Sequence, residues 1–475
     1  MFALLNMSPI ALVISMIMFF RRPPIEAAIG GAILAVVLWL SGMTVPVTAL
    51  IGSAIAADTA VLFASTAFVI APGLLFVVLI ERIGVNQALS DWVKGLGWGP
   101  SARIVFVVLG LAPLLEAMTG FGVSLIATVP LLFALLERRV ALKVAMTGMA
   151  IMPWGTLGLA TVVGATLAHL DPSALGSMSA FTSAPVFAMM VLIALWVSGQ
   201  RNILAFGFGL AFAALFVLIL YLFNHYVGPE IAGVGAAASI AVFGLLAAKL
   251  SSQTSIAWPK AAWPYAALLT IIIGLKTINA MTGLDTAFIV KGVEVSWKPF
   301  ASPGIALLIV DAILLVYANS DQVMSKFLMR AKRPLLTIMF FLLMSQTLVK
   351  AGFLDHAKEL LSTLAPTALA PLIAAFGGIA GYLTGSNVGG NAIVMPSIAH
   401  LTLPAHALDV LAAVQNSAAG HAALGSLPIV AIILGLAKAE RQEEQELVRF
   451  GCLLAVLNSV AVGLMGMALA SYLAH

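Results

Sequence analysis

A polar, glycine-containing stretch from Leu114 to Ser124 lies between two apolar segments that are each too short to cross a membrane. A helix needs about 20 residues to span the ~30 Å hydrocarbon core. Arg103 precedes the first segment and Arg138 follows the second, so the positive-inside rule places both ends on the inner side. The chain therefore has to turn back within the membrane, which predicts a re-entrant hairpin over residues 101–137.

The same order of apolar run, Thr-Gly, polar cluster and apolar run returns about 265 positions later, from Tyr382 to Asn391. This second stretch predicts a second hairpin over residues 366–402, entering from the outer side because no Lys or Arg flanks it closely. Irregular backbone at membrane depth is tolerated only where protein buries it or where it lines a watery cavity. Two polar tips at that depth therefore indicate a binding site.

The composition excludes a soluble globular protein. Of the 475 residues, 62% are hydrophobic and 9% are charged, whereas about a quarter of a soluble domain is charged. The net charge of +4 requires no nucleic acid, because the basic residues lie in short loops where they set topology. The single cysteine, Cys452, excludes disulfides and thiolate metal sites, and the chain has no phosphate-binding GxxxxGK[ST] loop. We expect no metal and no cofactor.

The fold class expected is an all-α polytopic membrane protein with about twelve transmembrane helices and two re-entrant hairpins. Most of the 23 Lys and Arg residues then lie on the inner side of the inner (plasma) membrane, with the N- and C-termini outside. An amphipathic stretch over 85–97 is expected along the inner surface. The spans expected are 5–20, 25–42, 60–80, 140–169, 180–198, 203–223, 229–248, 261–279, 301–318, 334–350, 406–436 and 449–472.

The two hairpins belong to two units of opposite topology. Seven crossings separate the first spans of the two units, and an odd number inverts the second unit relative to the first. The expected division is N-terminal helices 1–59, repeat unit 1 over 60–170, central helices 171–333, repeat unit 2 over 334–436, and an inner charged segment with the last helix over 437–475.

Each unit also contains a span that we expect to be broken near its middle. In 140–169 the break is expected at Met152–Thr156, because Pro153 removes a helical hydrogen bond and Gly155 weakens the next turn. In 406–436 the break is expected at Gln415–His421. Broken helices opposite hairpins are a recurrent way to build transporter sites, since the freed backbone groups coordinate ions and anions.

Glu116 is the sharpest single candidate for chemistry, because an ionisable residue at membrane depth costs about 3 kcal/mol or more. It could handle a coupled proton or form an ion pair with Arg103. The other polar and glycine residues of the tips could bind a small polar solute or serve only as turns and helix caps. These are Thr119, Gly120, Gly122, Ser124, Thr384, Gly385, Ser386, Asn387 and Asn391.

The residues at the two breaks form a second set of substrate-binding candidates, although small residues there could also serve only helix packing. They are Trp154, Gly155, Thr156, Asn416, Ser417, Gly420 and His421. His421 could share a proton with a substrate carboxylate or satisfy a buried carbonyl. Asp311, in span 301–318, could relay a proton or pair with Lys276.

Leu115-Glu116-Ala117-Met118-Thr119-Gly120-Phe121-Gly122 and Leu383-Thr384-Gly385-Ser386-Asn387-Val388-Gly389-Gly390-Asn391-Ala392 resemble the hairpins of the L-lactate permease family, within the wider ion transporter superfamily. The resemblance extends over about 60–170 and 334–436. It implies proton-driven secondary transport of small hydroxy-monocarboxylates such as lactate or glycolate, and the wider superfamily implies a possible homodimer. It also places Glu116, Gly120, Phe121, Gly122, Thr384, Gly385, Ser386, Asn387 and Asn391 at the site.

The function expected is secondary active transport of a small organic monocarboxylate by alternating access. Helix N-terminal N–H groups, hydroxyls and Asn amides would hold the carboxylate, and Glu116 would carry the coupled proton. The alternatives are a sodium-coupled carrier of another small organic anion and a cation:proton antiporter on the same scaffold. A channel is a weaker alternative. An enzyme is also weaker, because no HExxH motif occurs and the polar residues gather at two symmetry-related breaks.

Overall fold

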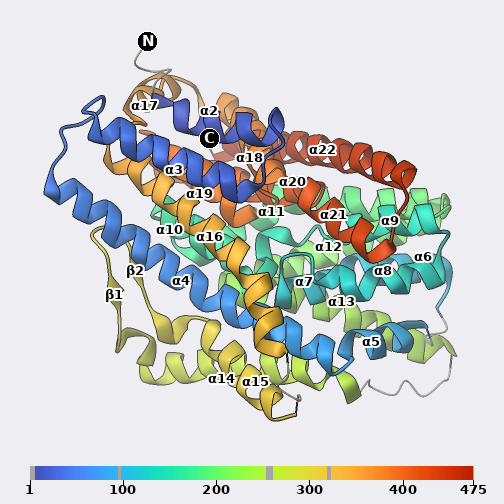
Figure 1. The fold of residues 1–475 in the computed structure, drawn as a ribbon. Helices are drawn as coiled ribbons and strands as arrows, with labels where there is room; N and C mark the ends of the chain where they lie inside the picture. Colours follow the sequence, from blue (N-terminus) through green and yellow to red (C-terminus); the bar gives the residue numbers. More distant parts are fainter. Residues whose placement is uncertain (1–5, 95–97, 253–259, 318–321, 474–475) are drawn as a thin grey trace.

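The computed structural model describes residues 6–94, 98–252, 260–317 and 322–473. Parts of the predicted span 5–20 and of the predicted surface stretch 85–97 lie outside these residues. The described chain is a bundle of helices with one short antiparallel β-hairpin, in which Val290 pairs with Trp297 and Lys291 with Ser296 (Figure 1). This architecture confirms the expected all-α polytopic membrane fold.

The helices used below follow one another along the chain with these bounds. They are α2 Ser8–Met18, α3 Pro24–Leu40, α4 Ala49–Arg82, α5 Val85–Lys94, α6 Pro100–Val105, a π-helix Phe106–Leu111, α7 Ala112–Thr119, α8 Ser124–Leu135, α9 Arg138–Thr147, a 3₁₀ turn Met152–Trp154, α10 Gly155–Ala168, α11 Pro172–Val197, α12 Ile203–Tyr226 and α13 Pro229–Ser252. Next come α14 Trp263–Thr282, β1 Val290–Lys291, β2 Ser296–Trp297, α15 Gly304–Tyr317, α16 Val323–Lys350, α17 Asp355–Leu361, α18 Pro366–Thr384, α19 Asn387–Ala399, α20 Ala405–Ala423, α21 Leu427–Ala437 and α22 Arg441–Leu473. Short 3₁₀ turns flank α14 and α15 at Lys260–Ala262, Leu284–Thr286 and Pro299–Ala301.

Nine of the helices in the described residues are long and apolar enough to cross a membrane, or ten if the bent pair α9 and α10 forms one span. Two of the nine are the first limbs of the predicted hairpins. The shorter helices α2, α3 and α15 and the basic helix α16 account for the remaining predicted spans.

The two units meet where α4 and α16 cross (Figure 1). An ion pair joins Asp58 to Lys350 near one end of the crossing, and another joins Glu81 to Arg330 near the other, each at 2.8 Å. The residue numbers rise along one helix as they fall along the other, so these first helices of the two units are antiparallel. The predicted boundaries 59/60 and 333/334 fall inside α4 and α16, which begin earlier than hydropathy alone indicated.

The hairpins differ from the prediction in one respect. The first limbs, Pro100–Thr119 and Pro366–Thr384, hold 20 and 19 residues and are long enough for a span, so the prediction that both limbs of hairpin 101–137 are too short was wrong for its first limb. Only the second limbs, α8 with 12 residues and α19 with 13, are short. The first limb is longer because helix continues past the apolar run into the polar residues up to each Thr-Gly.

The broken helices also differ from each other. In the first unit the chain bends by 56° between Thr147 and Met152, and irregular backbone continues through the predicted Met152–Thr156 to Gly158. In the second unit α20 runs unbroken through Gln415–His421, and the interruption lies further on, between Ala423 and Leu427. The predicted position was therefore wrong. The polar side chains of Gln415 and its neighbours bond to adjacent helices and leave the helical backbone intact.

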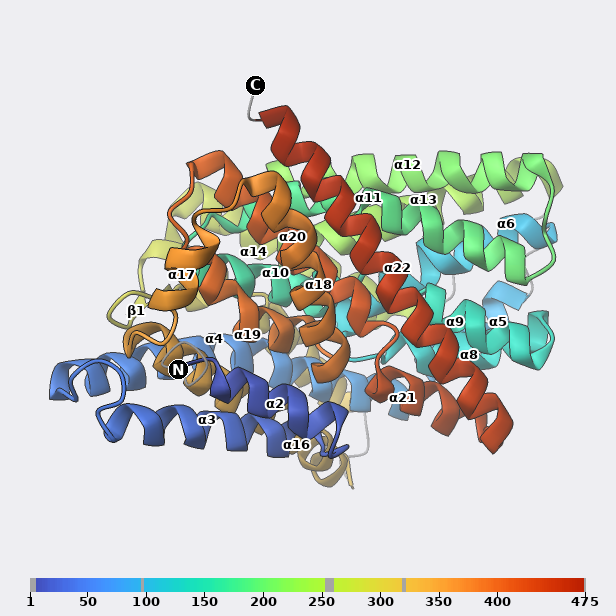
Figure 2. The same ribbon diagram turned by 90° about the horizontal axis from the view of Figure 1, so that it is seen from above.

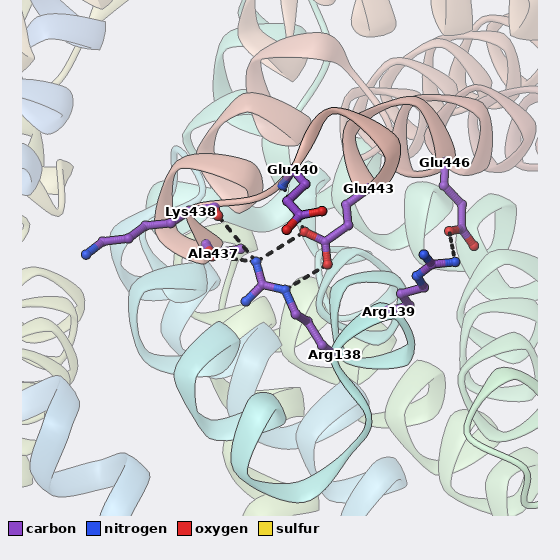
Figure 3. Close-up of polar contacts among 7 residues, drawn as sticks. All are labelled: Arg138, Arg139, Ala437, Lys438, Glu440, Glu443 and Glu446. Carbon is purple, nitrogen blue, oxygen red and sulfur yellow. Dashed lines mark hydrogen bonds and ion pairs between the residues drawn. The ribbon is translucent and has the colours of Figure 1, made fainter.

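A group of ion pairs ties the start of α9 to the junction of α21 and α22 (Figure 3). The Arg138 guanidinium donates to both carboxylate oxygens of Glu443, at 2.7 and 3.1 Å, and to the Ala437 carbonyl at 2.7 Å. Arg139 and Lys143 both pair with Glu446. Such two-pronged Arg–carboxylate contacts fix geometry as well as charge, so the start of α9 is held to the junction of α21 and α22.

Candidate functional site

The two hairpin tips and the two helix breaks lie together in the middle of the bundle. Seen from above, α10, α18, α19 and α20 lie near the middle of the molecule, and α18 and α20 pack beside α22 (Figure 2). The tip of the first hairpin packs against the break before α10, and the tip of the second packs against the start of α21.

Glu116 closes the tip of the first hairpin. Its side chain is fully buried, one carboxylate oxygen accepts from the Gly122 N–H at 3.0 Å, and the other accepts from the Ser124 hydroxyl at 2.8 Å. The carboxylate therefore lies at the N-terminus of α8, where the helix dipole and the free N–H groups favour an anion. These partners belong to its own hairpin, and they are not the Arg103 that the sequence offered as an alternative.

The first tip packs closely against the first break because Gly120 has no side chain. A Cβ built at Gly120 would lie 1.7 Å from the Thr156 hydroxyl oxygen, so the two backbones can approach only with glycine there. Gly120, Phe121 and Gly122 all have positive φ, as do Thr156 and Leu157. Gly155 faces the Glu116 carbonyl across the same contact. The predicted residues of this tip and this break are thus brought together.

Two predicted residues near this contact are engaged elsewhere. The Trp154 indole N–H donates to the Asn224 side-chain oxygen of α12 at 3.0 Å, so its ring is directed into the packing of α11 to α13. The Thr119 hydroxyl donates to the Leu115 carbonyl of its own helix at 2.6 Å. Neither side chain presents its polar atom to the other predicted residues.

The second tip is closed by hydroxyls and has no carboxylate of its own. The Thr384 hydroxyl donates to the Ala380 carbonyl at 2.8 Å and to the Ser386 carbonyl at 2.9 Å. The Ser386 hydroxyl accepts from the Gly389 N–H at 3.3 Å and so caps α19. Gly385, with φ of +65°, lies against Pro428 at the start of α21.

Asn416 is the centre of a buried polar network. Its amide oxygen accepts from Asn387 at 3.1 Å and from Asn391 at 2.9 Å, both on α19. Its amide nitrogen donates at 3.0 Å to the hydroxyls of Thr161 on α10 and Ser179 on α11. One side chain of α20 therefore joins the second hairpin, the first broken helix and α11, using residues from both units.

The network continues to Ser417, whose hydroxyl lies 2.6 Å from that of Thr182 and 3.0 Å from that of Ser183. Thr161, Ser179, Thr182 and Ser183 were missed by the sequence analysis. A signal was present, since Ser179, Thr182 and Ser183 recur at helical spacing in an apolar span and so share one face of α11.

Several polar atoms around this network have no hydrogen-bond partner among the described residues. They include the side-chain oxygens of Asn387, Asn391 and Gln415. Buried polar atoms are nearly always hydrogen-bonded, so a cluster without protein partners is a candidate position for a ligand, an ion or ordered water. His421 stands edge-on to Phe187 at 5.6 Å, and Gly420 packs on Pro153 of the first break.

Asp311 is not brought to this site. It is buried on the face of α15 that packs against α4, and neither carboxylate oxygen has a hydrogen-bond partner. Lys276, the alternative partner considered for it, pairs instead with Glu230 at 2.8 Å. In the described residues no group of three or more His, Cys, Asp or Glu side chains could hold a metal ion.

The fold and the site thus define a polytopic membrane protein with two hairpins and two interrupted helices around a buried polar centre. No protein-family model matches the chain. No curated protein matches it. The chain is similar to the solved structure of the Alcanivorax borkumensis YdaH transporter, described as having an unusual topology, with 14% identity, a TM-score of 0.49, and coverage of 95% of this chain and 98% of that one.

Proposed function

We propose that this protein is a secondary active transporter of small organic monocarboxylates of the lactate and glycolate type, coupled to protons by symport. The observation that carries the proposal is the difference between the N-termini of the two hairpin return helices. At α8 the anion position is filled by Glu116, whereas α19 is capped only by the Ser386 hydroxyl. The second N-terminus is therefore suited to a carboxylate from outside the chain.

The surroundings of α19 supply further groups for such a solute. Asn387 and Asn391 lie on its first turns and Asn416 lies opposite, all buried. Their amides can reorganise to donate to a carboxylate and accept from a hydroxyl, which is the pairing that a 2-hydroxy acid requires. Units of inverted topology around one central site are the recurrent basis of alternating access.

Glu116 would couple proton binding to transport by changing the conformation of the first tip. As a carboxylate it accepts from Gly122 and Ser124, but a protonated oxygen becomes a donor and needs an acceptor. Proton binding therefore changes the hydrogen bonds that hold the tip. Because Gly120 of the tip contacts Thr156 directly, this change would reach the first break and the helix that supplies Thr161 to the network.

The test is uptake of labelled lactate into proteoliposomes under an inward proton gradient without sodium, with unlabelled monocarboxylates as competitors. We expect uphill uptake by the native protein. Glu116→Gln should abolish accumulation yet retain lactate exchange, because the amide keeps the shape of the tip but cannot carry the proton. Glu137→Gln, at an exposed position before α9, is the matched control and should accumulate lactate normally. Accumulation by Glu116→Gln would remove this residue from the coupling role.

A sodium-coupled carrier is the second candidate, favoured by the unpartnered amide oxygens of Asn387 and Asn391. Hard cations prefer such oxygen ligands. The same proteoliposomes distinguish the two, since uptake that appears only when sodium is supplied at fixed pH would replace the proton with sodium and leave the anion site in place.

A further inference from the structure

A cavity of about 220 Å³ lies at the end of the bundle that holds the β-hairpin, away from the network around Asn416. Its walls are α4, α10, β2 and the turn before α15. Most of the lining is apolar and includes Val61, Leu62, Leu157 and Val163. Leu157 belongs to the left-handed segment of the first break, so the cavity borders the element that contacts the first hairpin tip.

Two charged residues line this cavity, and each already has a partner. Glu230 pairs with Lys276 at 2.8 Å, and Lys298 pairs with Asp285 at 3.1 Å. The Lys298 side chain is 45% exposed, and an exposed ion pair contributes little stability. The present partner of Lys298 is a carboxylate, so a carboxylate from solution can take its place at little cost.

The β-hairpin forms one wall of the cavity and is held in place by contacts to Asp58 of α4 and Lys350 of α16. The Asp58 carboxylate accepts from the backbone N–H groups of Val293 and Glu294 in the turn between the strands. The Lys350 ammonium forms ion pairs with both the Asp58 carboxylate, at 2.8 Å, and the Glu294 carboxylate, at 3.1 Å. Trp297 of β2 stands edge-on to Phe68 of α4 with ring centroids 5.2 Å apart. These contacts hold Ser296, Trp297 and Lys298 in the wall of the cavity.

We propose that this cavity is an outer binding site for monocarboxylates with an apolar body, with the carboxylate at Lys298 and the body between α4 and α10. The inference rests on the proposed carrier function and adds monocarboxylates with a longer or aromatic body to its substrates. A volume of about 220 Å³ is that of about seven water molecules, and a mostly apolar wall contributes more to binding a longer or aromatic acid than to binding lactate. The carrier therefore prefers acids such as hexanoate or benzoate over lactate at this site.

The test uses cysteine reactivity, since Cys452 is the single cysteine and can be replaced by serine. Ser65→Cys on α4 and Thr166→Cys on α10 place thiols on opposite walls, and Thr286→Cys is an exposed control outside the lining. Right-side-out and inside-out vesicles are labelled separately with a membrane-impermeant maleimide. We expect both wall thiols to react in one of the two preparations only. Hexanoate and benzoate should slow that labelling at least fivefold, lactate less, and none should affect Thr286→Cys.

The same vesicles separate this site from the carrier function. Lys298→Gln should raise the KM for benzoate uptake about tenfold with kcat unchanged, whereas Lys291→Gln on β1 should leave both unchanged. Labelling that no carboxylate slows, with uptake intact, would overturn the outer site and leave the carrier. Protection without any uptake would keep the site and overturn the carrier. If neither protection nor uptake occurs, both proposals fail.

Discussion

The tips of the two hairpins share the pattern of apolar run, Thr-Gly, polar cluster and apolar run, but the N-termini of their return helices are capped by different groups. The first tip contains its own anion, because Glu116 fills the N-terminus of α8 through Gly122 and Ser124. The second tip has no charge, and Ser386 caps α19 with a hydroxyl. Under the proposed function the two tips would divide the tasks, because the first would exchange a proton and the second would receive the carboxylate of the ligand.

The surroundings of the two tips also differ, because only the second tip lies beside an extended network of polar side chains. The first tip meets the break before α10 at Gly120, which lies directly against the Thr156 hydroxyl and backbone. Behind the second tip lies the network of Asn387, Asn391 and Asn416, which reaches into both units. The first contact is suited to transmit a change of shape, and the second is suited to hold a polar solute.

The largest effect is expected from Asn416→Ala. This side chain makes four hydrogen bonds in the network, and its loss leaves buried partners on α10, α11 and α19 unsatisfied. We expect the free energy of unfolding to fall by about 2 to 4 kcal/mol and uptake to be lost. Thermal unfolding in detergent measures the change. Asn458→Ala, a buried Asn with one bond to the His421 carbonyl, is the control and should cost about 1 kcal/mol. Equal losses in the two variants would contradict the central position of Asn416.

An intermediate effect is expected from Gly120→Ala. The positive φ strains any residue with a Cβ, and that Cβ would overlap the Thr156 hydroxyl. Together these should cost about 2 to 3 kcal/mol and slow transport more than binding. Thermal unfolding and uptake are again the measurements, and Thr156→Ala should partly rescue the variant because it removes the overlapping oxygen. If Thr156→Ala restores neither stability nor uptake, overlap between the tip and the break is not the cause of the Gly120→Ala defect. Gly274→Ala, in α14 with open space around it, should be tolerated.

The smallest effect is expected from Ser386→Ala, which removes one side-chain cap from α19. Its cost should be about 1 kcal/mol, with a weaker affinity for the substrate and the same proton dependence. Binding titrations at several pH values measure this. A changed proton dependence would mean that the second tip also takes part in coupling, and the division of tasks between the tips would then be wrong.

Much of the scaffold could be predicted because it depends on hydropathy and charge alone. The apolar runs, the basic loops and the repeated Thr-Gly stretches gave the helices, the hairpins and the first break near their observed places. The second break was misplaced because polar residues in a helix were taken as a sign of irregular backbone. Gln415, Asn416 and Ser417 remain helical since their side chains bond across to neighbouring helices.

The sequence by itself determined that the chain lies in a membrane, that it contains two units of opposite topology, and that each carries a polar tip. These properties follow from local patterns of apolar and basic residues, which act over one helix length. Only the tertiary structure decided that Glu116 faces its own hairpin, that Trp154 turns away toward Asn224, and that Asn416 joins four helices. Those partners are separated by up to 255 positions along the chain, so only packing brings them together.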